Sequence, residues 1–173
     1  SNLNLGIQMA AAELANRGYL RIGVAVTRWI DLRSQNGYSG GMFFYHRDLP
    51  PKRRVPTLLM PHHQIGENFD SFSEWIKKHR PDAVISFERH VPEWLKQLGL
   101  RVPEDIGLVM HDWTERMGGY AGIHHRRDQV ASAAVDLIAT QLLHNEFGIP
   151  AAPRQILVPP TWVNGPSVRP AVG

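Results

Sequence analysis

The stretch that decides the fold is RVPEDIGLVMHDW, residues 101–113. Its opening VPED holds the proline and aspartate that favour a turn. The apolar run at 106–110, with its β-branched members, is typical of a strand covered on both faces of a sheet. In open α/β sheets, ligands bind just beyond the carboxyl ends of the strands. Asp112, two residues beyond this strand, is therefore the first candidate for contact with a ligand.

Further apolar runs alternate with helical patterns on both sides of this stretch. We predict strands at 20–26, 55–60, 82–87, 121–123 and 155–158. We predict helices at 3–18, 30–45, 70–78, 92–98 and 128–148, the third capped by Asp70. This alternation predicts an α/β fold, a parallel sheet with helices on both faces.

The longest predicted helix begins near Asp128 and has apolar residues at helical spacing. These residues are Val130, Ala134, Leu137, Ile138 and Leu142. Their spacing predicts one buried stripe along the helix.

Composition limits the class of protein. The chain has 173 residues, 43% hydrophobic and 20% charged, enough for one globular domain with a core. It has no cysteine, which excludes disulfides, a thiol nucleophile and a cysteine-based zinc site, and fits a reducing compartment such as the cytoplasm. No apolar run approaches the roughly 18 residues of a membrane helix. The first residues also lack the basic and apolar regions of a signal peptide. We therefore expect a cytoplasmic protein without a membrane partner.

The net charge is +3, and basic residues cluster at 50–54, 77–80 and 124–127. A nucleic-acid footprint would gather such residues on one face beside a recognition motif. The clusters are scattered and no helix-turn-helix or zinc-finger signature accompanies them, so we interpret them as solvated surface.

Two histidine pairs, His62–His63 and His124–His125, suggest a metal site. Adjacent histidines lack the i, i+4 spacing that a helix uses for zinc, and no HExxH motif is present. We therefore expect no bound metal.

A Ser-His-Asp set can be assembled from Ser86, His111 and Asp112, but no GxSxG motif supports it. The phosphate-binding patterns GxGxxG and GxxxxGK[ST] are absent as well. We expect neither catalysis nor a cofactor.

Three segments, in this order, resemble the effector-binding core of the LacI/GalR family of bacterial transcriptional regulators. They are LANRGYLRI at 14–22, RPDAVIS with LGLRVPEDIGLVMHD within 80–112, and GIHHRRDQVASAAVDLI to RQILVPP within 122–160. The resemblance implies a periplasmic-binding-protein-like fold of type I. In that fold two α/β subdomains enclose a cleft for a small molecule, often a sugar.

The resemblance also implies that the chain is a fragment truncated at its N-terminus. Residues 20–119 would form the C-terminal subdomain, whereas the helices at 1–18 and 126–150 would belong to the N-terminal one. Such a fragment would sense a small-molecule effector, expected to be a carbohydrate, for a homodimeric regulator. That regulator would bind operator DNA through a helix-turn-helix that the sequence lacks. The alternative is a periplasmic sugar-binding protein of a transporter.

Four candidate site residues lie near the ends of the middle strands, and the resemblance implies a role for three of them. Asp112 matches an acidic residue that accepts hydrogen bonds from ligand hydroxyls, although a turn aspartate is the alternative. Phe87 and Arg89 flank Glu88 where the family has an Asn-Asp pair. Phe87 would stack on the face of a sugar, or else pack in the core. Arg89 would pair with an aspartate or an acidic ligand, or else form a surface ion pair. Trp113 is a second stacking surface or a lid over the core.

Four more residues lie at the other strand exits. Arg33 is one position away from the family's ligand arginine, where Ser34 stands, a rotation of about 100° on a helix. Trp29 and Asp31 follow the first strand and are candidates of equal merit. His125 matches a polar residue that faces the cleft, or else lies on the surface of a hinge.

Overall fold

The computed structural model describes residues 2–61, 67–149 and 152–171. Its strands are β1 (Ile22–Thr27), β2 (Leu58–Met60), β3 (Ala83–Ser86), β4 (Gly107–Met110), β5 (Ala121–His124) and β6 (Thr161–Val163). They form one sheet in the order β2-β1-β3-β4-β5-β6. The pairs from β2 to β5 are parallel, and β6 runs antiparallel to β5.

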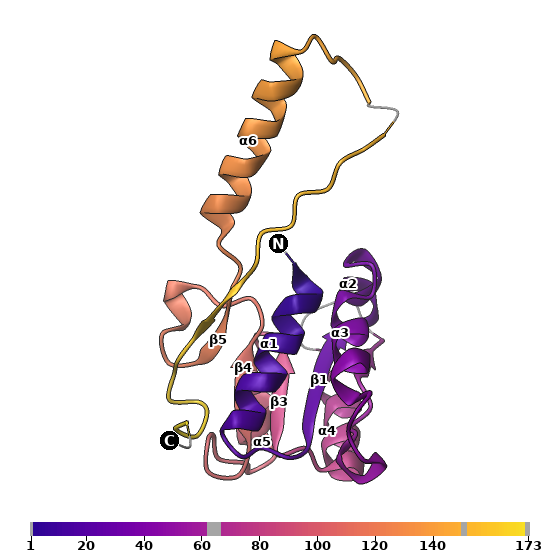
Figure 1. Ribbon diagram of the computed structural model, residues 1–173. Helices are drawn as coiled ribbons and strands as arrows, with labels where there is room; N and C mark the ends of the chain where they lie inside the picture. Colours follow the sequence, from indigo (N-terminus) through magenta and orange to yellow (C-terminus); the bar gives the residue numbers. More distant parts are fainter. Residues whose placement is uncertain (1, 62–66, 150–151, 172–173) are drawn as a thin grey trace.

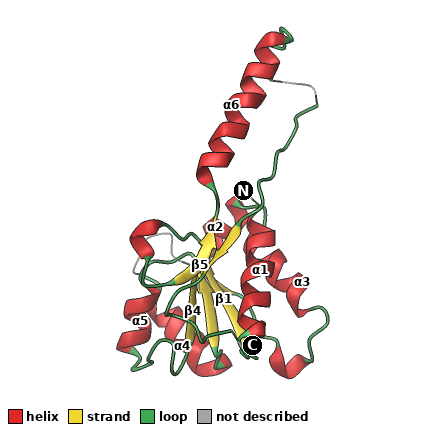
Figure 2. Cartoon of the chain, turned by 60° about the vertical axis from the view of Figure 1, so that its left-hand side comes forward, coloured by secondary structure: helices red, strands yellow, loops and turns green. Residues whose placement is uncertain are grey.

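Helices cover both faces of this sheet. The α-helices in the described residues are α1 (Leu3–Asn16), α2 (Arg28–Arg33), α3 (Gly37–His46), α4 (Phe69–His79), α5 (Val91–Gln97) and α6 (Arg127–Leu143). Figure 2 shows α1 and α3 on one side and α4 and α5 on the other. One buried cluster joins the sheet to α1 and α3, and a second joins it to α4 and α5. The predicted α/β fold is confirmed.

Three predicted boundaries are wrong. The helix predicted at 30–45 is two helices, because Gln35 and Asn36 take left-handed φ angles of 55° and 59° between them. The N-cap of α4 is Asn68, and Asp70 lies in the first turn. The strand predicted at 155–158 begins instead at Thr161, where the chain reaches β5 and can pair with it.

The helix α6 projects away from the sheet, and residues 152–160 return beside it (Figure 1). None of its residues is buried, and Val135, Ile138 and Leu142 are 64%, 58% and 56% exposed. The predicted buried stripe is therefore wrong in this structure, because no layer other than the returning segment lies against the helix. We refer to residues 127–160 below as the arm.

The first helix differs from the sixth. Ile7, Ala10 and Leu14 of α1 are buried in the core beside α3 and the sheet. The resemblance assigns residues 1–18 to the N-terminal subdomain, and in this structure α1 packs against β1, β3, β5 and β6. Its small residues explain this, since Gly6 and Ala10 allow a close approach to the strands. The subdomain boundaries themselves stay a prediction.

No helix in the described part of the chain is long and apolar enough to span a membrane.

The central strand β1 tolerates little added volume at Gly23. A Cβ atom there would lie 2.5 Å from the ring of Trp75, which is buried on α4 and donates a hydrogen bond to the Pro56 carbonyl. We expect Gly23→Ala to lower the free energy of unfolding by about 1–3 kcal/mol, because the fixed ring must move. Gly119→Ala is the control, since a Cβ there meets nothing within 4 Å. Urea denaturation of both variants tests this, and equal midpoints would contradict it.

Candidate ligand-binding site

The parallel strands bring several polar side chains to one edge of the sheet. The carboxyl ends of β1, β3, β4 and β5 lie side by side, and they are followed by residues 28–33, 87–89, 111–113 and 125–127. We call these residues the carboxyl edge. The arm starts from the same edge (Figure 1).

Asp112 forms an ion pair with Arg127, the first residue of α6. The Asp112 side chain is 15% exposed and that of Arg127 is 65% exposed. The strongest candidate from the sequence is therefore accessible, but an arginine already contacts one of its carboxylate oxygens. Sequence reasoning missed Arg127. Its signal was the HHRR cluster at 124–127, which we interpreted as solvated surface.

Beneath this ion pair lies a pair of buried histidines. The rings of His111 and His125 are 4.8 Å apart, and Nε2 of His125 lies 2.6 Å from the backbone oxygen of His111. Tyr38 of α3 packs 4.7 Å from the His111 ring. Burial, and to a smaller extent His125, lower the pKa of His111 to about 3. Burial also lowers the pKa of His125. His125, a predicted ligand residue, is only 5% exposed and joins β5 to the base of the arm.

Asp31 has a structural role. It is 2% exposed, and its carboxylate accepts hydrogen bonds from the backbone N–H groups of Tyr38 and Ser39 and from the Ser39 hydroxyl. These bonds satisfy donors at the start of α3, where the N-cap residue makes no side-chain bond. We therefore withdraw Asp31 as a candidate for ligand contact.

Trp29 and Arg33 lie together on α2. The Arg33 guanidinium is 4.5 Å from the centre of the Trp29 ring, which suits a cation–π contact. Trp29 is 39% exposed. Both side chains remain accessible from solvent at the exit of β1.

The segment after β3 divides its residues between core and surface. Phe87 packs edge-on against Tyr38, with ring centres 6.4 Å apart, in agreement with the packed-ring alternative. Glu88 is buried and accepts hydrogen bonds from the backbone and ring of His90. Arg89 is exposed.

Trp113 packs over β5 and its flanking residues. Its ring nitrogen donates to the Tyr120 carbonyl at 3.0 Å, and its ring meets His124 edge-on at 5.9 Å. A Cβ atom on Gly122 would lie 2.6 Å from Trp113. These contacts favour the lid over the stacking surface.

Neither catalytic nor metal chemistry gains support from the described residues. The Ser86 hydroxyl is buried, donates to the Ala25 carbonyl and accepts from the Glu88 N–H. Within 2–61, 67–149 and 152–171, no three His, Asp or Glu side chains are grouped to hold a metal ion. His62 and His63 lie outside these residues.

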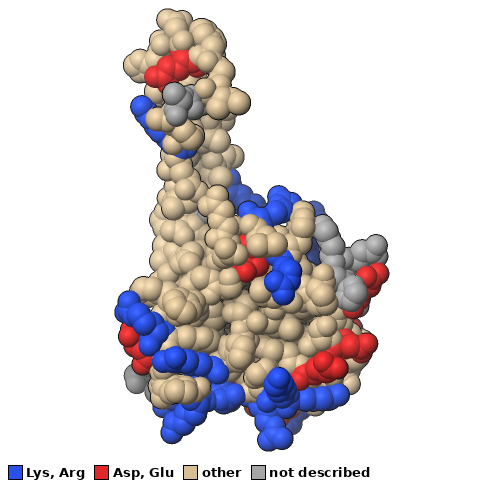
Figure 3. Space-filling model, turned by 90° about the vertical axis from the view of Figure 1, so that its right-hand side faces the viewer, with Lys and Arg blue, Asp and Glu red and all other residues tan. Residues whose placement is uncertain are grey.

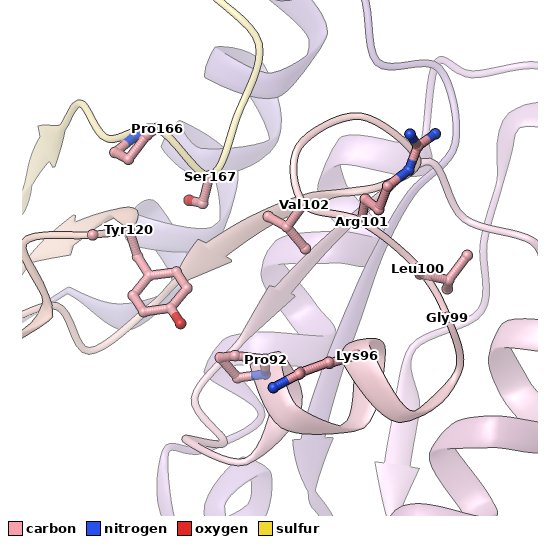
Figure 4. A pocket seen from close by; sticks show the side chains of 10 residues that line it. Pro92, Lys96, Gly99, Leu100, Arg101, Val102, Tyr120, Pro166 and Ser167 are labelled. Atoms are coloured by element: carbon pink, nitrogen blue, oxygen red, sulfur yellow. The ribbon is translucent and has the colours of Figure 1, made fainter.

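Two hollows of the surface lie away from the carboxyl edge. One, of about 630 Å³, lies beside α5 at the opposite end of the strands (Figure 4) and is lined by Pro92, Lys96, Val102, Tyr120 and Ser167, among others. Its polar groups are largely engaged, because Ser167 bonds Leu108 and Ala121 and Arg101 bonds Asp105. The other, of about 690 Å³, separates α6 from residues 152–154. Neither of these two hollows is lined by a predicted site residue.

Comparisons agree with this architecture. The family model described as "periplasmic binding protein-like domain" matches residues 11–168, so the chain belongs to that family. A search of curated protein sequences found no match.

Several solved structures with the same fold are transcriptional regulators. A LacI family regulator from Enterococcus faecalis with bound ribose has a TM-score of 0.75 at 13% identity, covering 98% of this chain and 62% of its own. The lac repressor dimer bound to operator and an anti-inducer has a TM-score of 0.73 at 16% identity. The match covers 97% of this chain and 59% of the repressor chain. CcpA of Lactococcus lactis has a TM-score of 0.67 at 11% identity, and the match covers 97% of this chain and 63% of CcpA. The chain thus spans about 60% of these relatives, and at these identities they show the fold alone.

The buried histidine pair predicts acid sensitivity. Folded His111 stays neutral down to a pKa of about 3, whereas an unfolded histidine takes up a proton near pH 6.5. Between these values the unfolded chain binds more protons, so the free energy of unfolding falls as the pH drops below 6.5. His111 alone accounts for a loss of about 2 kcal/mol at pH 5.

Urea denaturation at about pH 7.5 and pH 5 measures this loss. His111→Gln has no group to titrate there, so it should lose about 2 kcal/mol less than the original chain between the two pH values. His144→Gln, at the exposed end of α6, should lose as much as the original chain. An equal loss in the original chain and His111→Gln would refute the assignment.

Proposed function

We propose that the chain is the ligand-sensing part of a bacterial transcriptional regulator of the LacI type. It binds a small molecule, a carbohydrate, at the carboxyl edge. Binding changes how the protein engages operator DNA, acting in the cytoplasm as a homodimer and without catalysis. The observation that carries this proposal is Asp112, which stands partly exposed beyond β4 where parallel sheets bind ligands.

The geometry of the arm supports regulation. Asp112 belongs to the sheet and Arg127 to the arm, so their ion pair links a ligand-accessible carboxylate to the base of α6. A ligand that bonds Asp112 changes the free energy of this link. It therefore shifts the population of arm positions only by the difference in its affinity for them. Ribose bound to a regulator of the same fold supports a carbohydrate as the ligand.

A periplasmic sugar-binding protein of a transporter is the second candidate, since the family includes periplasmic binding proteins by its description. The two candidates differ in their response to DNA. In the regulator, ligand changes the affinity of the whole protein for DNA, whereas a transport protein binds ligand and has no affinity for DNA. A gel-shift titration of the whole protein with and without the carbohydrate separates them.

Asp112→Asn tests the site itself. The amide keeps the shape of the side chain but loses the charge and one acceptor oxygen, so we expect carbohydrate affinity to fall about tenfold or more. Calorimetric titration of the 173-residue chain with a panel of sugars measures this. Asp136→Asn, on the exposed face of α6, should bind as the original chain does. Equal affinity in Asp112→Asn, or no binding across the panel, would refute the proposed site.

A further inference from the structure

The state of Asp112 restricts which carbohydrate fits. A neutral sugar offers hydroxyl donors to a carboxylate, but one oxygen of Asp112 is already the acceptor for Nη2 of Arg127. If a neutral sugar displaced Arg127 from Asp112, it would replace a hydrogen bond between two charged groups by bonds in which only the carboxylate is charged. It would also leave the guanidinium without its counter-charge. A ligand with its own negative charge avoids this loss.

Arg127 has capacity to spare for such a charge. A guanidinium has five N–H donors, and one nitrogen of Arg127 contacts Asp112. The side chain is 65% exposed, so other donors are accessible to a ligand at the carboxyl edge. Planar donor pairs of arginine suit carboxylate and phosphate oxygens.

The start of α6 favours negative charge at the same place. The helix has 17 residues and begins at Arg127, and the N-cap side chain of Arg126 makes no capping bond. Its first N–H groups and the positive end of its dipole therefore lie beside the ion pair. Figure 3 shows Lys and Arg side chains beside the base of the arm, with Asp or Glu side chains next to them.

Acidic neighbours oppose this field only in part. Asp128, in the first turn of α6, and Glu115, 3.9 Å from His124, are exposed carboxylates. Asp31 and Glu88 are buried and hydrogen-bonded, so they do not face a ligand. Arg127 itself is the group that meets both Asp112 and solvent.

We propose that the ligand of the carboxyl edge is an anionic carbohydrate, with a carboxylate or phosphate near its hydroxyl groups, and that Arg127 selects it. A hydroxyl donates to the second oxygen of Asp112 while the anionic group accepts from the remaining donors of Arg127. The Asp112–Arg127 pair stays intact, and the ligand binds across it. This inference rests on the ligand-binding role proposed above for Asp112.

Titration of the 173-residue chain with matched ligands tests the inference. The set is an aldohexose, its uronic acid and its 6-phosphate, so that the two sources of negative charge are compared with a neutral parent. We expect at least one anionic ligand to bind about tenfold or more tightly than the aldohexose, with an affinity that falls as salt is added. Arg127→Gln should remove this preference, so that neither anionic ligand binds more tightly than the aldohexose.

Arg101→Gln is the matched control, because Arg101 also pairs with an aspartate, Asp105, but lies before β4 at the opposite end of the strand. It should keep the preference for the anion. Circular dichroism confirms that each variant is folded. An aldohexose that binds as tightly as both anions, or a preference unchanged in Arg127→Gln, would overturn the role of charge while the ligand site stands. Binding of no carbohydrate at all would overturn the proposed function, and this inference with it.

Discussion

The parallel register of β1, β3, β4 and β5 is the constraint on which the rest of the structure depends. Because these strands run in one direction, residues far apart in sequence leave the sheet at one edge. His125 of one strand exit thereby contacts His111 of the next, and Asp112 contacts Arg127. Helices pack on both faces of these strands, so the exposed side chains of the edge stand on a buried platform.

The carboxyl edge carries a charged ion pair at its surface and uncharged polar side chains beneath it. Below the Asp112–Arg127 pair, His111 and His125 are packed against Tyr38, whose pKa is raised by burial and by the nearby carboxylates of Asp112 and Asp31. A protonated phenol and two uncharged imidazoles need no counter-ion in this region. The charge of the edge is therefore concentrated in the ion pair that joins sheet and arm. In the proposed function, Asp112 and Arg127 therefore determine which charged groups of a ligand can bind at this edge.

Much of this fold could be predicted from the sequence, because buried strands and amphipathic helices repeat with their own periods. The candidate site could be predicted less well. Asp112 was found because a carboxylate directly after a buried strand is informative by position alone. Asp31 has the same kind of position after β1, yet its hydrogen bonds with Tyr38 and Ser39 depend on where α3 starts. Arg127 was missed because its partner is 15 residues away, on the far side of a loop and the strand β5, and no local pattern specifies that contact.

The arm shows why a periodic pattern alone does not place a helix. The stripe of α6 predicts burial, but a stripe is buried only if a surface lies opposite it, and here that surface is only the returning segment 152–160. Apolar side chains such as Ile138 and Leu142 stay in water at a cost of about 1 kcal/mol or more each. Whatever covers them would fix the direction of α6 and with it the position of Arg127. In the proposed function, ligand binding at Asp112 and the covering of the arm are therefore thermodynamically linked, since both act on the same ion pair.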